Sequence, residues 1–280
     1  MRFTFAYNRE GNVIPPVTPS VSDLVELGIL TKQISEFSNS DIGTEVSIPY
    51  NNAGSGISGP IIFEVVGVNH HTSEEHQKTI TLMTKNIIRK ASFDAPEPNN
   101  TNSYRKNGGN NRWSVSNIRQ WLNSNGAAGS WWSAQHEYDA SPTSGNLSGA
   151  DTAYADAPGF LAGFSANVLQ HFTDITNTTA LHTSDGGGFE TTVDKVFLPS
   201  FTEMGLATGE GSHLSIRYPD ANSRIKQWNG SDDYYWTRSP YRAMYPQNVG
   251  FINAEGNSPN YTFFTGASAD YGIAPIIVLH

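Results

Sequence analysis

The chain has 280 residues, of which 37% are hydrophobic and only 15% are charged, and it contains no cysteine. This length suits one large domain, whereas the missing cysteines exclude disulfides, thiolate zinc sites and thiol nucleophiles. The net charge of −9, with no run of Lys or Arg, argues against a nucleic-acid partner, because phosphate binding needs clustered cations.

Residues 1–20 predict an extended arm that precedes a single domain over residues 21–280. Alternating Phe3, Phe5 and Tyr7 are followed by the proline-rich run Val13–Pro19, and prolines fix φ and donate nothing to a strand ladder. The arm is typical either of an edge strand with a linker or of a tether to a partner subunit. The amino terminus lacks the apolar core and cleavage site of a signal peptide. No segment approaches the ~18 apolar residues of a membrane span, so we expect no membrane partner.

The region before residue 93 predicts one short helix and three strands. The helix spans Ser20–Gly28, with Ser22 as its N-cap and Gly28 at its end. The strands, rich in β-branched residues, are expected at Val46–Tyr50, Ile61–Val68 and Thr79–Thr84.

A second helix is predicted after a loop over residues 94–112. Ser114 or Ser116 caps it, and Ile118, Trp121 and Leu122 share one apolar face at spacings of three and four. Residues 124–158 again have loop composition, and a further helix is expected over Phe160–Phe172.

The second helix carries residues that we expect in the core. Trp113 and Trp121 supply an aromatic face that packs on a sheet. Arg119 is expected to pair with an acidic residue or with loop carbonyls, and Asp194 and Glu203 both remain candidates.

From Lys195 onward the chain predicts short strands separated by long loops. One or two helices among many short strands indicate an α+β fold. The strands are expected at Val196–Leu198, Tyr235–Trp236, Val249–Ile252, Tyr261–Phe264 and Ile273–Leu279.

The segment from Trp228 to Tyr261 interleaves aromatic residues with Asn and Arg, which predicts a binding surface. Aromatic rings offer large contact areas at low entropic cost, and Asn offers adaptable hydrogen bonds, a combination that also suits carbohydrate. About half of these residues are expected in the core instead. The predicted ligand-binding residues are Trp228, Tyr241, Arg242, Tyr245, Asn248, Asn253, Asn257 and Asn260. Those expected at the surface, where Pro and Gly interrupt the strands, are Tyr241, Tyr245, Asn253, Asn257 and Asn260.

No cofactor, bound metal or catalytic residue is predicted. Trp228-Asn-Gly-Ser-Asp-Asp233 could offer oxygens to Ca²⁺, but its spacing fits no standard loop and favours a solvated turn. Glu97-Pro98-Asn99 copies the sugar-specificity tripeptide of calcium-dependent lectins at the wrong place in the chain. His70-His-Thr-Ser-Glu-Glu-His76 lacks a second ligand cluster, and no nucleophile-elbow, phosphate-loop or zinc-protease motif is present.

Several motifs in order resemble a domain family of unknown function that is widespread in Gram-positive gut bacteria and their phages. The resemblance covers roughly residues 40–280. The motifs are Gly109-Asn-Asn-Arg-Trp113, Ser116–Ser124, Trp132–His136, Pro158–Leu161, Asp185–Gly188, Asp194–Leu198 with Glu203, Trp236–Pro240 and Gly272–Ile277.

That family looks like the C-type-lectin-like fold, in the branch of formylglycine-generating enzymes and phage variable receptor-binding proteins. The closing strand after Gly272 and the Trp236-Thr-Arg-Ser-Pro240 element suggest this placement, while the missing cysteines exclude formylglycine generation. The resemblance implies a binding scaffold whose C-terminal part carries the binding surface.

We therefore expect a non-enzymatic virion protein, made in the host cytoplasm without a signal peptide. It would decorate the capsid or sit on the tail as a homo-oligomer, attached to other virion proteins by its arm. It would bind host cell-surface carbohydrate or another virion protein. Two alternatives remain open: a glycan hydrolase with paired carboxylates, and a bacterial lectin-like adhesin unrelated to phage.

Overall fold

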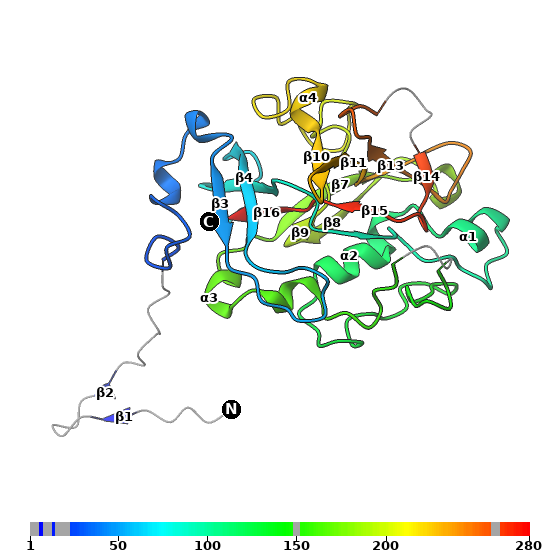
Figure 1. The fold of residues 1–280 in the computed structure, drawn as a ribbon, viewed down its shortest axis with the longest axis horizontal. Helices are drawn as coiled ribbons and strands as arrows, with labels where there is room; N and C mark the ends of the chain where they lie inside the picture. The colour runs from blue at the N-terminus through cyan, green and yellow to red at the C-terminus, as the bar shows by residue number, and fades with distance from the viewer. Residues whose placement is uncertain (1–5, 8–12, 15–22, 148–151, 259–263) are drawn as a thin grey trace.

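The computed structural model describes residues 6–7, 13–14, 23–147, 152–258 and 264–280. Short helices lie beside mostly antiparallel sheets, which confirms the α+β class (Figure 1). One hydrophobic core runs from Leu24 to Leu279 and joins both large sheets. No helix among these residues is long and apolar enough to cross a membrane.

The first large sheet places the last strand of the chain inside the sheet rather than at its edge (Figure 1). Its β16 lies between β5 and β9, and Ile276 faces both Met83 and Phe197. All four residues of β16 and all five of β5 are buried, as a strand covered on both faces requires. The strand order is β3 (Glu45–Ile48), β4 (Ile61–Val68), β5 (Ile80–Thr84), β16 (Ile276–Leu279) and β9 (Val196–Phe197).

The second large sheet is built around β12, all six residues of which are buried. β12 runs antiparallel to β13 and parallel to β15. The strand order is β14 (Phe264–Gly266), β13 (Asn248–Ile252), β12 (Tyr235–Pro240), β15 (Tyr271–Ile273) and β6 (Arg89–Ala91). The strands predicted at 46–50, 61–68, 79–84, 196–198, 235–236 and 249–252 are confirmed within two residues at their starts.

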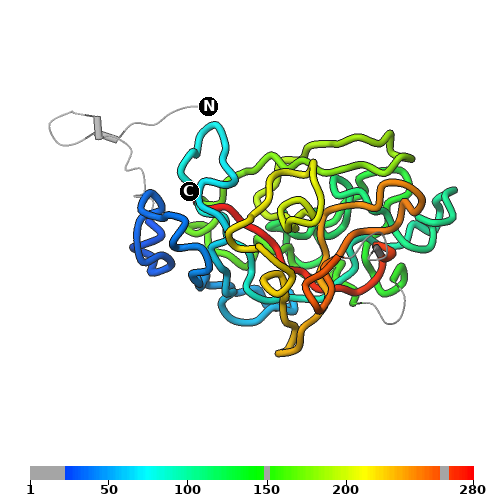
Figure 2. Tube along the Cα trace, turned by 90° about the horizontal axis from the view of Figure 1, so that it is seen from above, coloured from blue at the N-terminus to red at the C-terminus, as the bar shows by residue number. Residues whose placement is uncertain are grey.

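Three two-stranded ribbons complete the sheets, and β7–β8 runs along one side of the body (Figure 2). This hairpin was not predicted, because Asn177 and Thr179 face inward where an apolar residue would have signalled a strand. The pairs are β1 (Ala6–Tyr7) with β2 (Val13–Ile14), β7 (Ile175–Ala180) with β8 (Phe189–Asp194), and β10 (Lys226–Trp228) with β11 (Ser231–Asp233). The rest of the predicted arm lies outside the described residues.

The helix predicted after residue 114 is confirmed as α2 (Asn117–Leu122). Ser116 is its N-cap, and the Ser116 hydroxyl accepts a hydrogen bond from the Arg119 amide. Trp113, Trp121 and Leu122 are fully buried, as expected for the core. Of the two acids considered for Arg119, the structure selects Asp194, at 2.6 Å.

Two of the predicted helices were wrong, the first in kind and the second in extent. Residues 24–28 form turns rather than a helix, although Gly28 does end them with a φ of +70°; Ser20 and Ser22 lie outside the described residues. The helix expected over Phe160–Phe172 breaks at Gly163, whose carbonyl accepts from the Asn51 amide and so leaves the helical ladder. The break leaves a 3₁₀ turn, η4 (Phe160–Gly163), and α3 (Ala166–Leu169).

One helix, α1 (Ser103–Gly108), lies within the segment predicted as loop. The Asn102 side chain caps it by accepting hydrogen bonds from the amides of Tyr104 and Arg105. The remaining short elements are η1 (Ile34–Glu36), η2 (Asn39–Asp41), η3 (Trp113–Val115), η5 (Thr183–Asp185) and α4 (Ala221–Arg224).

Candidate functional site

A cleft of about 310 Å³ opens where the end of β12 meets the β7–β8 hairpin and the loop over residues 199–210. Apolar and polar groups both line it, and the Phe189 side chain at its edge is 47% exposed. The lining residues are Ala180, Phe189, Phe201, Leu206, Ala207, Thr208, Glu210, Ser239, Pro240, Tyr241, Arg242, Ala243 and Ser258.

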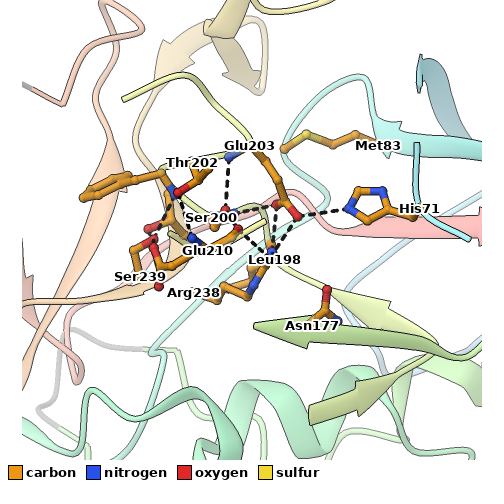
Figure 3. A network of polar contacts seen from close by, with 12 residues as sticks. His71, Met83, Asn177, Leu198, Ser200, Thr202, Glu203, Glu210, Arg238 and Ser239 are labelled. Atoms are coloured by element: carbon orange, nitrogen blue, oxygen red, sulfur yellow. Dashed lines mark hydrogen bonds and ion pairs between the residues drawn. The ribbon is translucent and has the colours of Figure 1, made fainter. Parts of the chain in front are cut away.

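Two polar side chains, Glu210 and Ser239, form part of the cleft wall while being almost fully buried. One Glu210 oxygen accepts from the Ala180 amide at 2.9 Å, and the other accepts from the Ser239 hydroxyl at 2.5 Å (Figure 3). Burial raises the pKa of Glu210 above its usual range, although these two hydrogen bonds oppose the rise. A carboxyl and a hydroxyl are thus held in fixed positions within the cleft.

A buried ion pair lies directly behind this wall. Arg238 donates to both oxygens of Glu203, at 2.7 and 2.8 Å, and both side chains are 1% exposed (Figure 3). Burial would raise the pKa of Glu203, but the charge of Arg238 and the hydrogen bonds from His71 and Arg238 hold that pKa well below its usual range. Glu203 is therefore an anion fixed by its partners.

Consecutive residues of β12 hold the 199–210 loop from two sides. Arg238 binds the Leu198 carbonyl and Glu203, whereas the Ser239 hydroxyl accepts from the Phe201 amide and donates to Glu210. The register between β12 and β13 shifts between Trp236 and Pro240, so an irregularity coincides with these two residues. The Arg-Ser pair of the resembling motif therefore builds the cleft wall.

The cleft mouth carries Tyr241 and Arg242. The Arg242 guanidinium lies 5.0 Å from the Phe189 ring centroid, a cation–π distance. It forms no ion pair and donates no hydrogen bond within the part of the chain that the structure describes. The Tyr241 ring stacks on Tyr245 at 5.9 Å, and the exposed Tyr104 ring of α1 meets Tyr245 edge-on at 5.5 Å.

Asn111 fixes the loop that bears these tyrosines. Its side-chain amide donates to the carbonyls of Tyr241 and Asn248, each at 3.0 Å, and its backbone amide donates to Pro246. Asn111 is fully buried, so both donors of its amide are satisfied inside the protein. The Gly109-Asn-Asn-Arg-Trp113 motif therefore contributes to the cleft mouth through Asn111 and to the core through Trp113.

The structure gathers only part of the predicted binding surface. Tyr241 and Arg242 line the cleft and Tyr245 adjoins it, whereas Trp228 lines a different groove of about 520 Å³ with residues 56–58, 60–62 and 85–88. Asn248 takes part through its backbone carbonyl, which accepts a hydrogen bond from the Asn111 side chain, and Asn260 lies outside the described residues.

The expected exposure of Asn253 was wrong. Asn253 is buried, because its side-chain oxygen accepts the Asn257 amide at 2.7 Å in the turn that follows β13. Asn257 is itself half-buried in that turn. These two amides satisfy the backbone of a turn and do not line the cleft.

Several residues of the site were not predicted from the sequence, among them Phe189, Glu210 and Tyr104. Glu210 had one usable signal: Gly209 and Gly211 flank it, and both adopt positive φ, at +106° and +98°. Two such glycines around an acid indicate a tight turn that holds it in place. Phe189 and Tyr104 carried no signal, because the hairpin and helix that present them were not predicted.

The segments considered as metal ligands have other partners. Trp228–Asp233 forms the β10–β11 hairpin, turning at Asn229 and Gly230, and Asp233 pairs with Lys90 at 2.6 Å. Glu97 is buried and accepts from Asn110, and His71 binds Glu203. Within the described ranges, no three or more His, Asp or Glu side chains gather in a way that could hold a metal ion.

One family model matches the chain: DUF6273, a domain of unknown function, covers residues 77–280. The match includes every residue that lines the cleft, and the whole of both β12 and α2. No curated protein and no solved structure matches.

Proposed function

We propose that this chain, which belongs to the DUF6273 family of domains of unknown function, is a non-enzymatic module that binds glycan in the cleft beside Tyr241 and Arg242. The observation that carries the proposal is the combination of the half-buried Tyr241 ring and the adjoining exposed Tyr245 ring at the cleft mouth with a fixed carboxyl and hydroxyl in its wall. Rings stack on the apolar faces of sugars, while Glu210 and Ser239 retain lone pairs for sugar hydroxyls.

The same cleft favours binding over hydrolysis by paired carboxylates. Such hydrolysis needs two carboxyl groups roughly 5–10 Å apart across the bond to be cleaved. Among the described residues that line the cleft, Glu210 is the single acid. The nearby Glu203 has both oxygens bound by Arg238 and cannot supply a free second carboxylate.

Binding is tested with the full chain on an array of bacterial surface polysaccharides, followed by calorimetry on the glycans that bind. Tyr241→Ala and Arg242→Ala should each weaken binding about tenfold, or ~1.4 kcal/mol, because each removes a contact at the mouth. Tyr234→Ala is the matched control, since Tyr234 is an exposed tyrosine, 37% accessible, that does not line the cleft. Equal affinities of Tyr241→Ala and wild type, or no glycan bound at all, would contradict the proposal.

We further propose that the domain is C-type-lectin-like and that it serves in a virion. The resemblance carried by the ordered motifs from Gly109 to Ile277 supports both ideas, and the final strand β16 lying inside a sheet is compatible with the fold. The role would be capsid decoration or a tail component. A bacterial lectin-like adhesin is the alternative, and the genes beside this one distinguish the two.

Attachment to the particle is proposed to depend on residues 1–20. Among the described residues the hydrophobic core begins at Leu24, so we expect a chain that starts at residue 21 to keep its fold and unfolding temperature. Its copy number in purified particles, measured by mass spectrometry, should fall to background. Full incorporation of the truncated chain would exclude this role for the arm.

A further inference from the structure

Three tyrosine rings form a row from α1 to the cleft mouth. Tyr104 meets Tyr245 at 5.5 Å, and Tyr245 meets Tyr241 at 5.9 Å, so each step is about the length of one sugar ring. Tyr104 and Tyr245 are 47% and 36% exposed. A single sugar bound in the cleft could not contact all three rings, so the row suits a ligand of several units.

The row is held rigid at both ends. Asn111 binds the Tyr241 and Asn248 carbonyls and also the Pro246 carbonyl, which closes the loop that carries two of the rings. Arg105, the neighbour of Tyr104, pairs with Asp185 at 2.5 Å and so ties α1 to the turn after β7. Rings fixed before binding lose little entropy when a ligand stacks on them.

At the cleft end of the tyrosine row, Arg242 carries a positive charge that no described acidic residue pairs with. Arg105 pairs with Asp185 of η5 at 2.5 Å, and Arg112 pairs with Glu190 of β8 at 2.6 Å. Arg242 has no acidic partner among the described residues, and its guanidinium lies 5.0 Å from the Phe189 ring centroid. In a chain of net charge −9, an arginine kept free at a cleft mouth suits an anionic ligand.

We infer that the cleft and the tyrosine row together bind several consecutive units of an acidic polysaccharide. One carboxylate or phosphate of the polymer pairs with Arg242, and successive sugar units contact the accessible faces and edges of Tyr241, Tyr245 and Tyr104, whose planes are inclined by 24° and 80° at the two steps. This inference rests on the proposed glycan-binding function and adds to it the charge and the length of the ligand.

The first experiment compares oligomers by calorimetry on the full chain. The probes are oligogalacturonates of one, three and six units, a hexamer of glucose units joined by phosphodiester bonds, and a neutral glucose hexamer. We expect at least one acidic hexamer to bind tenfold or more tightly than the neutral one, and its affinity to rise with length. The carboxylate and phosphate arms identify the anionic group. Added salt should weaken binding of the acidic hexamer, because salt screens the attraction between solvent-exposed charges such as Arg242 and the anionic group.

Two substitutions test separately how binding depends on the length of the ligand and on its charge. Tyr104→Ala should weaken the acidic hexamer fivefold or more and leave the monomer unchanged, whereas Arg242→Gln should abolish the preference for acidic over neutral hexamers. Lys78→Gln, at an exposed lysine in the loop before β5, is the charge-matched control and should change neither. Unfolding temperatures check that each variant is folded.

The outcomes distinguish this inference from the function on which it rests. Neutral and acidic hexamers of equal affinity, or a Tyr104→Ala variant with undiminished hexamer binding, would overturn the acidic-polymer inference and leave a glycan site. If no probe and no arrayed polysaccharide bound in a Tyr241-dependent manner, the acidic-polymer inference and the proposed glycan-binding function would both be contradicted.

Discussion

Replacing Asp194 by alanine is expected to destabilise the fold by about 3–5 kcal/mol, because it leaves a cation and several buried donors unpaired. The buried Asp194 carboxylate accepts from Arg119 and Thr192, each at 2.6 Å, and from Trp113 and Asn177, each at 3.1 Å. These donors come from α2, β8, η3 and β7, so one carboxylate connects four elements.

Urea unfolding of the Asp194→Ala variant measures this effect. Asp174→Ala is the matched control, since Asp174 is 58% exposed and pairs only with Lys195, at 3.2 Å. A surface pair of this kind contributes less than about 1 kcal/mol. If both variants lost similar stability, Asp194 would not have the central role that its contacts indicate.

Replacing Glu203 by glutamine should cost a comparable amount, about 3–5 kcal/mol, because Arg238 would remain buried without its paired carboxylate. Arg238 is 1% exposed and fully enclosed behind the cleft wall. Glu210→Gln is the internal control: burial already raises the pKa of Glu210, so a neutral isostere there should cost far less. Equal losses in the two variants would contradict the contrast between the two glutamates.

The pH dependence of stability follows from the lowered pKa of Glu203. A carboxyl whose pKa is lower in the folded chain than in the unfolded chain stabilises the fold above its unfolded pKa, ordinarily 4.5. That contribution is lost as the pH falls below 4.5 toward the folded value. The stability gap between wild type and Glu203→Gln, measured in urea at pH 7 and pH 3, should therefore narrow at pH 3. A gap that stayed constant or widened would show that the ion pair is not its source.

The two glutamates also explain a motif that the sequence left without a role. Glu203 and the Arg238-Ser239 pair were recognisable as parts of one ordered pattern, but nothing in their spacing joined them. In the fold, Arg238 binds Glu203 and Ser239 binds Glu210, so the motif holds a loop in place. The contacts that bring these residues together span 29 to 35 positions of sequence.

Within the candidate site, local composition identified the residues that one loop carries by itself. Tyr241, Arg242 and Tyr245 lie within five positions and were predicted from their interleaved aromatic and polar character. Phe189 and Tyr104 come from distant elements and meet that loop only in the folded chain. The sequence around Asn253 is as polar as an exposed loop, but its side chain turns inward to accept a hydrogen bond from the Asn257 amide and is buried.

The sequence by itself determined the α+β class, most strands and the capped helix α2, because hydrophobic periodicity, β-branched runs and a Ser cap are local properties. It did not determine where helices break: Gly163 ends one because the Asn51 amide takes its carbonyl. Only the tertiary structure decided that Asp194, rather than Glu203, pairs with Arg119, and that Asn111 holds the cleft mouth. The physical reason is that these contacts join residues far apart in the chain. A charged or polar side chain has many possible partners in the sequence, and the packing of the folded chain brings only one of them within reach.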